Sequence, residues 1–193
     1  VITGGAGNDT ITLTGGEIDT WTASGVTATA PYAGINNGSD TVTFLAGAAE
    51  GQFDLDPLKN VSGTGGSTNW LTVEGNATNP LTVNTADDGD IALNGKIIAL
   101  DVVGANVPTA SLIASYIGTT TNTGSNYLAL TDNGSGIIVK GDKDASTTKL
   151  TIWWVDSALD GDGTDVTAAD VHLLITSAGN IDIDVMHAAQ FIV

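Results

Sequence analysis

One nine-residue motif near the start of the chain has residue types and spacing suited to binding a metal ion. It runs from Gly4 to Thr12 as G-G-A-G-N-D-T-I-T and fills every specified position of the repeat G-G-x-G-x-D-x-(apolar)-x. Its glycines allow a tight turn whose backbone carbonyls approach an ion, and Asp9 adds a carboxylate. Because Ca²⁺ prefers oxygen ligands, the motif predicts a calcium-binding turn, followed by a strand that buries Ile11. A glycine-rich hairpin turn without an ion is the alternative.

A second copy of the motif follows at residues 37–43, where Gly38, Asp40 and the apolar Val42 keep their offsets. Weaker copies lie at 15–19 and 87–91. A β-roll needs about three or more such turns, because each turn buries its apolar face only against the next. We therefore predict a roll-like beginning with Asp40 as a further ligand. Since the motif lies at the start and the chain opens on Val1, we expect a longer or processed parent protein.

A second acidic stretch follows the Trp-rich segment of the chain. Its centre, Asp160-Gly161-Asp162-Gly163-Thr164, resembles the middle of an EF-hand or dockerin calcium loop. In that alignment Ala158, which has no side-chain oxygen, occupies the first ligand position, unless Asp156 supplies this ligand instead. Asp170 lies one residue later than the final acidic ligand of such a loop. We predict a calcium loop with an insertion, and an acidic turn without an ion is the alternative. The candidate ligands are Asp156, Asp160, Asp162, Asp165 and Asp170.

The composition narrows the possible partners. The 193 residues include 22 acidic and 5 basic side chains, for a net charge of −17. Nucleic acid and anionic membrane surfaces are poor partners for such a chain. Cysteine is absent, which excludes disulfides and thiolate metal sites, and no apolar run is long enough to span a membrane. Self-repulsion that calcium relieves would make the ion a folding switch, and a merely soluble acidic surface is the alternative.

The apolar pattern predicts a mainly all-β fold with a β-roll-like start, then stacked or sandwich sheets with one short helix. We divide it into a Thr/Gly-rich β region at 1–104 and a C-terminal β domain at 105–193. Asn94-Gly95 predicts a hairpin turn. Strands are expected at 10–14, 41–44, 69–75, 81–84, 90–95, 96–104, 127–130, 136–140, 149–155 and 171–175.

The one helix is predicted at 108–118. Its apolar residues recur at helical spacing, Thr109 or Ser111 is suited to cap its start, and Gly118 is suited to close it. Trp153 and Trp154 alternate along a strand, so we expect one in the core and the other partly exposed, with sugar binding as an alternative role.

No catalytic constellation stands out, and we expect that the chain is not an enzyme. No Ser/His/Asp order with a supporting motif and no phosphate-binding loop is present. The acids Asp54 and Asp56, within 50–57, could serve a glycosidase or a cation site, but a solvated turn is favoured. We interpret His172 and His187 as ordinary sheet or surface residues, and the turn with Asp142, Asp144 and two lysines as charge compensation.

These features together resemble the C-terminal regions of RTX-type proteins exported by type I secretion, and are most similar to bacterial surface-layer proteins. The resemblance covers 1–43 by motif and about 105–193 by the order of elements. It implies calcium ligands at Asp9 and at the carbonyls around Gly4 and Ala6. It also implies ligands in the second loop and an export signal in the last several tens of residues. The loop ligands are Asp160 and Asp162, then Asp156, Asp165 and Asp170.

The favoured hypothesis is a secreted, calcium-dependent structural protein on the cell surface. Its partner would be itself, in a lattice or filament, with cell-surface polysaccharide as a further candidate. Two features favour self-assembly: the chain has many strands able to pair at an edge, and it has acidic loops that calcium could bridge between copies. The alternative is a C-terminal calcium-folding and type I secretion module of an adhesin or exported hydrolase.

Overall fold

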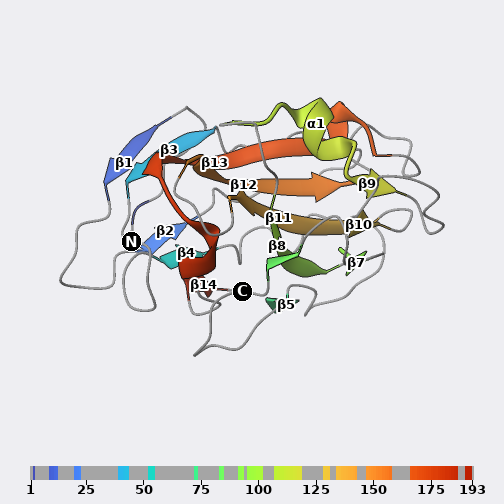
Figure 1. Cartoon of the computed structure of the whole chain (residues 1–193), viewed down its shortest axis with the longest axis horizontal. Coiled ribbons are helices and arrows are strands. Elements are labelled where there is room, and N and C mark those ends of the chain that lie inside the picture. The colour runs from blue at the N-terminus through green and yellow to red at the C-terminus, as the bar shows by residue number, and fades with distance from the viewer. Residues whose placement is uncertain are drawn as a thin grey trace.

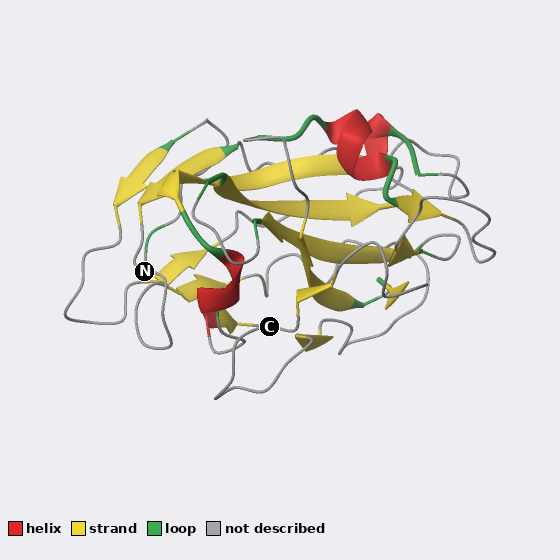
Figure 2. Ribbon diagram, in the orientation of Figure 1, coloured by secondary structure: helices red, strands yellow, loops and turns green. Residues whose placement is uncertain are grey.

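A computed structural model gives the fold of the chain (Figure 1). The residues that it describes are 2, 9–12, 20–22, 39–43, 52–54, 72–73, 83–84, 91–93, 95–101, 107–118, 128–130, 134–142, 147–157, 166–186 and 190–192. Strands predominate among them, which confirms the predicted mainly β class (Figure 2). None of the helices in these ranges is long and apolar enough to cross a membrane.

The largest sheet has eight strands. Its order is β1 (Thr10–Thr12), β3 (Asp40–Thr43), β13 (Val171–Asn180), β12 (Lys149–Asp156), β11 (Ser135–Gly141), β8 (Lys96–Asp101) and β5 (Thr72–Val73), and β6 (Val83–Asn84) also pairs with β8. Strand β12 is antiparallel to both of its neighbours, and every other pairing in the sheet is parallel. Strand β12 lies in the interior of the sheet, between β13 and β11.

Two smaller sheets and three short helices complete the described structure. One sheet has the order β7 (Ile91–Ala92), β10 (Leu128–Ala129), β9 (Ile117–Gly118), and the other β14 (Phe191–Ile192), β4 (Gln52–Asp54), β2 (Thr20–Thr22). The helices are α1 (Ala110–Ala114) and the 3₁₀ turns η2 (Ala168–Asp170) and η3 (Ile183–Val185).

The first strands stack in layers with the last ones. Strand β1 pairs in parallel with β3, and β3 with β13, while β2 pairs in parallel with β4, and β4 with β14. The strand pairs β1 and β2, β3 and β4, and β13 and β14 therefore form three successive two-strand layers, each giving one strand to each sheet. This is the arrangement expected of a roll, but its third layer comes from the C-terminal part of the chain.

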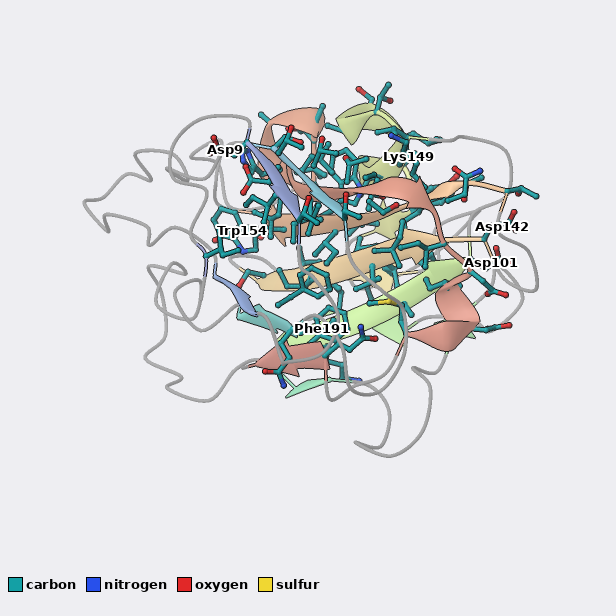
Figure 3. The ribbon with its side chains drawn as sticks, turned by 90° about the vertical axis from the view of Figure 1, so that its left-hand side faces the viewer. Asp9, Asp101, Asp142, Lys149, Trp154 and Phe191 are labelled. Atoms are coloured by element: carbon teal, nitrogen blue, oxygen red, sulfur yellow. The ribbon has the colours of Figure 1, made fainter. Side chains whose placement is uncertain are left out.

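Both faces of the large sheet are covered. Helix α1 lies on one side and the sheet of β2, β4 and β14 on the other (Figures 1 and 3). The α1 side has an apolar cluster that includes Ile138 and Trp153. In the small sheet, the rings of Phe53 and Phe191 lie 5.8 Å apart. The predicted exposure of one tryptophan is wrong, because Trp153 is 3% exposed and Trp154 0%.

The helix is shorter than predicted. Thr109 caps it as expected, since its hydroxyl accepts a hydrogen bond from the Leu112 amide at 3.2 Å. The helix ends at Ala114 rather than near Gly118, because Ile117–Gly118 form strand β9 and pair with β10. Pairing in a sheet takes the backbone out of the helix before the glycine is reached.

Two local predictions are corrected by sheet pairing. A turn does form at Gly95, where φ is 65° and the Lys96 amide bonds to the Leu93 carbonyl at 3.0 Å. It does not close a hairpin, because β7 pairs with β10 while β8 pairs with β5, β6 and β11. The expected solvated turn at 50–57 contains strand β4 instead, with Phe53 fully buried.

The large sheet contains strands from both sides of the predicted boundary between 104 and 105. Strand β3 pairs with β13, and β8 pairs with β11. The two predicted regions therefore share a sheet, and their division into domains stays a prediction.

Two glycines in the large sheet provide a test of this packing. A Cβ on Gly136 would lie 2.5 Å from the Leu93 carbonyl oxygen, whereas a Cβ on Gly179 would meet nothing within 4 Å. We expect Gly136→Ala to lower the free energy of unfolding by about 1–3 kcal/mol through overpacking. Gly179→Ala should leave it within about 0.5 kcal/mol of the parent. Urea unfolding at one fixed calcium concentration measures both, and equal effects of the two variants would contradict the packing.

Candidate metal centre

The two copies of the motif lie side by side in the same phase. Strands β1 and β3 pair with Thr10 opposite Thr41 and Ile11 opposite Val42. Asp9 immediately precedes β1, and Asp40 is the first residue of β3. The parallel register thus places each aspartate at the same point of its layer. The interior positions match as well, because Ile11 is 6% and Val42 0% exposed.

One backbone-to-side-chain and one backbone–backbone hydrogen bond connect the segments that carry the two aspartates. The Asp9 amide donates to Asp40 Oδ1 at 3.1 Å, and the Thr41 amide donates to the Asp9 carbonyl at 2.7 Å. Asp40 is fully buried and Asp9 half-buried. Figure 3 shows Asp9 beside the first strand, at the side of the sheet opposite Asp101 and Asp142.

One carboxylate oxygen in this pair is suited to bind a cation. Within the described ranges, Asp9 Oδ2 is buried and accepts no hydrogen bond. A carboxylate oxygen removed from water without a partner is costly, and a bound cation offsets that cost. Two carboxylates on adjacent layers are hard oxygen ligands of the kind that Ca²⁺ takes.

A complete calcium shell needs more oxygens than this pair supplies. In the part of the chain that the structure describes, no group of three or more His, Cys, Asp or Glu side chains lies together. The predicted ligand positions Gly4 and Ala6, whose carbonyls would extend the shell, lie outside the described residues.

The ends of the second acidic stretch are described, but its centre is not. Asp160, Asp162 and Asp165 lie outside the described residues. Asp156 is the last residue of β12, Asp170 immediately precedes β13, and both are fully buried. The two strands are antiparallel, with Val155 opposite Val171, so these aspartates lie at one end of the strand pair.

Asp170 has a structural role in this position. Its Oδ2 accepts hydrogen bonds from the Thr167 amide at 2.8 Å and the Thr167 hydroxyl at 2.9 Å. The Thr167 hydroxyl in turn accepts from the Ala169 amide at 3.2 Å, which completes a capping box around η2. This capping role is compatible with the predicted role of Asp170 as a calcium ligand, because a carboxylate has a second oxygen.

The large sheet brings both predicted calcium stretches toward one of its ends without merging them. Strands β1, β3 and β13 begin at the end where β12 finishes. Asp40 lies opposite Ile175, which pairs with Ile152, and Asp156 lies four residues further along β12. At about 3.3 Å per residue, that is roughly 13 Å along the strand direction. The stretches are therefore two separate candidate sites.

A buried lysine was missed by sequence reasoning. Lys140 is 0% exposed, and its Nζ donates to the Thr148 hydroxyl at 3.4 Å. Burial lowers the pKa of its ammonium, and the carboxylates of Asp142 and Asp101 oppose that shift. Asp142 also accepts a hydrogen bond from the Thr147 hydroxyl. The sequence signal for this burial was the position of the lysine at the end of the apolar run of β11. The carboxylate of Asp142 opposes the pKa shift, which agrees with the charge compensation predicted for this turn.

The remaining candidates contribute little to a site. His172 is half-buried opposite Trp154 on the neighbouring strand, and His187 and Asp144 lie outside the described residues. The indole Nε1 of Trp154 is buried and donates no hydrogen bond within the described ranges.

Comparisons of the chain with protein-family models, with curated proteins and with solved structures found no match. The resemblance to RTX-type and surface-layer proteins therefore stays a prediction that depends on the motifs alone.

The two halves of the capping box separate the possible roles of Asp170. We expect Thr167→Ala and Asp170→Ala each to lower the free energy of unfolding by about 0.5–2 kcal/mol through lost capping. If Asp170 also binds calcium, the cost of Asp170→Ala grows with calcium concentration, while that of Thr167→Ala does not. Denaturant unfolding at two calcium concentrations, both sufficient for folding, distinguishes the cases. Equal growth in both variants would contradict a specific ligand role.

The buried ammonium of Lys140 predicts a pH dependence. Its folded-state pKa lies below the unfolded value, so between the two the unfolded state binds more protons and stability rises with pH. The cost of the buried charge is fully present below the folded pKa and disappears toward about pH 10.4, the ordinary lysine value. Relative to Lys140→Met, the parent should therefore gain stability from pH 7 to 10. A constant difference would contradict this, and Lys149→Met, at a half-buried position, serves as the control.

Proposed function

We propose that the chain is a secreted, calcium-dependent structural protein that assembles with copies of itself at the cell surface. The observation that carries this proposal is the stacking of Asp9 and Asp40 in adjacent layers, with Asp40 buried and Asp9 Oδ2 buried without a hydrogen bond.

Calcium would act on the contact between the first two layers. Asp9 and Asp40 are like charges on neighbouring strands, and their repulsion opposes the pairing of β1 with β3. An ion between them replaces that repulsion with attraction. An extracellular-type site, with a Kd of about 10⁻⁴–10⁻³ M, contributes roughly 2–3 kcal/mol when calcium exceeds Kd about a hundredfold.

The net charge of −17 extends this argument to the whole chain. An acidic surface opposes both folding and contact between copies, and bound cations reduce that repulsion. A calcium-poor compartment would then keep the chain unfolded, and a calcium-rich exterior would allow it to fold and assemble.

A calcium titration of EGTA-stripped protein tests the proposal. We expect the β signal in circular dichroism to appear at about 10⁻⁴–10⁻³ M calcium, with light scattering showing large particles over the same range. Folding without assembly would favour the secretion-module alternative. A chain that is folded and indifferent to calcium would sink both proposals.

Single substitutions connect the titration to the two aspartates. Asp9→Asn and Asp40→Asn should each raise the calcium concentration at half-folding by roughly threefold or more, because each removes an anionic ligand. Asp182→Asn is the matched control. It removes the same charge beside Asp142, at the opposite side of the sheet from Asp9 (Figure 3), and its amide oxygen can still cap η3. If all three variants shift the midpoint equally, net charge rather than a site explains the calcium effect.

A further inference from the structure

Strand β1 is the outer strand of the large sheet at the end that carries the candidate metal centre. Among the described residues its one strand neighbour is β3. The hydrogen bond from the Thr41 amide to the Asp9 carbonyl fixes the direction of its backbone groups. In a parallel pair the backbone amides and carbonyls of alternate residues point toward opposite neighbouring strands. Those of Ile11 therefore point toward β3, and those of Thr10 and Thr12 point outward from the sheet.

The described residues of this edge lack the sequence features that usually protect an edge strand. Strand β1 is Thr-Ile-Thr, without lysine, proline or charge, and its two threonine side chains are exposed. A row of outward amides and carbonyls flanked by β-favouring residues is a template for another strand.

The other end of the large sheet differs. There β5 and β6, two residues each, cover different parts of β8. In a head-to-tail contact between copies, β1 of one copy would have to pair with the edge of the other copy that β5 and β6 share. The sequence Thr-Ile-Thr, in contrast, reads the same in both directions and is complementary to itself in an antiparallel pair.

We propose that β1 pairs with the β1 strand of a second copy around a two-fold axis, which joins the two large sheets into one. Thr10 then lies opposite the partner's Thr12, and each such pair exchanges two backbone hydrogen bonds. Ile11 lies opposite the partner's Ile11 as the closely spaced pair at the axis, on the interior face. Threonines directly opposite one another also favour cross-strand contact on the exposed face.

This inference depends on the proposed function, because it makes the contact sensitive to calcium. Asp9 immediately precedes β1, so its charge lies next to the edge and is repeated near the axis by the partner. An ion held by Asp9 and Asp40 removes local repulsion where the strands must meet. The resulting dimer is closed, so a lattice or filament would need a second contact elsewhere.

A charge-pair experiment tests the register. Thr10→Glu combined with Thr12→Glu places like charges opposite one another, and should raise the dimer dissociation constant roughly tenfold or more. Thr10→Glu combined with Thr12→Lys places opposite charges together and should restore the dimer, as should the reversed combination. Sedimentation velocity of the intact chain in saturating calcium measures each constant. A mixed-sign variant as dissociated as the double glutamate variant would overturn the antiparallel register.

Controls separate this contact from charge and folding effects. Ser111→Glu with Ser115→Glu adds the same two charges at two exposed positions, one in α1 and one at its C-cap, and should leave the dimer intact. Circular dichroism checks that every variant folds. Particles that form equally in the parent and the double glutamate variant would overturn this contact and leave the proposed assembly standing. A parent that remains monomeric in calcium would overturn both, and a dimer without larger particles would overturn the lattice alone.

Discussion

The described structure depends on the two different pairings of strand β13. On one side β13 is antiparallel to β12, as in an ordinary meander. On the other it is parallel to β3, and through β3 to β1. The antiparallel contact fixes β13 against the apolar core strands, so it presents an ordered edge to the N-terminal layers. Without that edge, three- and four-residue strands such as β1 and β3 would have little to pair with, because short isolated strands are marginal in water.

The same parallel pairing places two like charges next to each other. In a parallel, in-register stack, equivalent positions of a repeated motif lie directly beside each other, so apolar residues meet apolar residues and aspartates meet aspartates. Ile11 and Val42 gain from this arrangement, whereas Asp9 and Asp40 do not. The burial that stabilises the first pair therefore also removes the second from water. A divalent cation is the simplest group that reconciles both, which is why the calcium proposal follows from the register.

Local patterns predicted the strands better than they predicted the partners of the strands. Alternation identified β1 and β3, apolar runs identified β11 and β12, and the motif offsets predicted that Asp9 and Asp40 are equivalent. The third layer was not predictable, because β3 pairs with a strand more than a hundred residues away, and no local signal encodes that pairing. The error at Gly95 has the same origin, since a turn sequence specifies the turn and not which strands pair. The exposure of Trp154 was misjudged because period-two alternation cannot show that both sheet faces are covered.

If the chain is exported as proposed, its C-terminal part has two roles, one in export and one in folding, and the first must precede the second. It supplies β13 and β14, which form the third layer of the stack and bury Phe191. The export signal that the resemblance implies in the same residues would have to be read before those strands pair, because paired and buried segments do not present their backbone to a receptor. A calcium-poor interior would keep the acidic layers apart during export, and a calcium-rich exterior would then close them onto β13. Under the proposed function the acidic charge and the dependence on distant strands are linked, since both would delay folding until the whole chain has reached the ion.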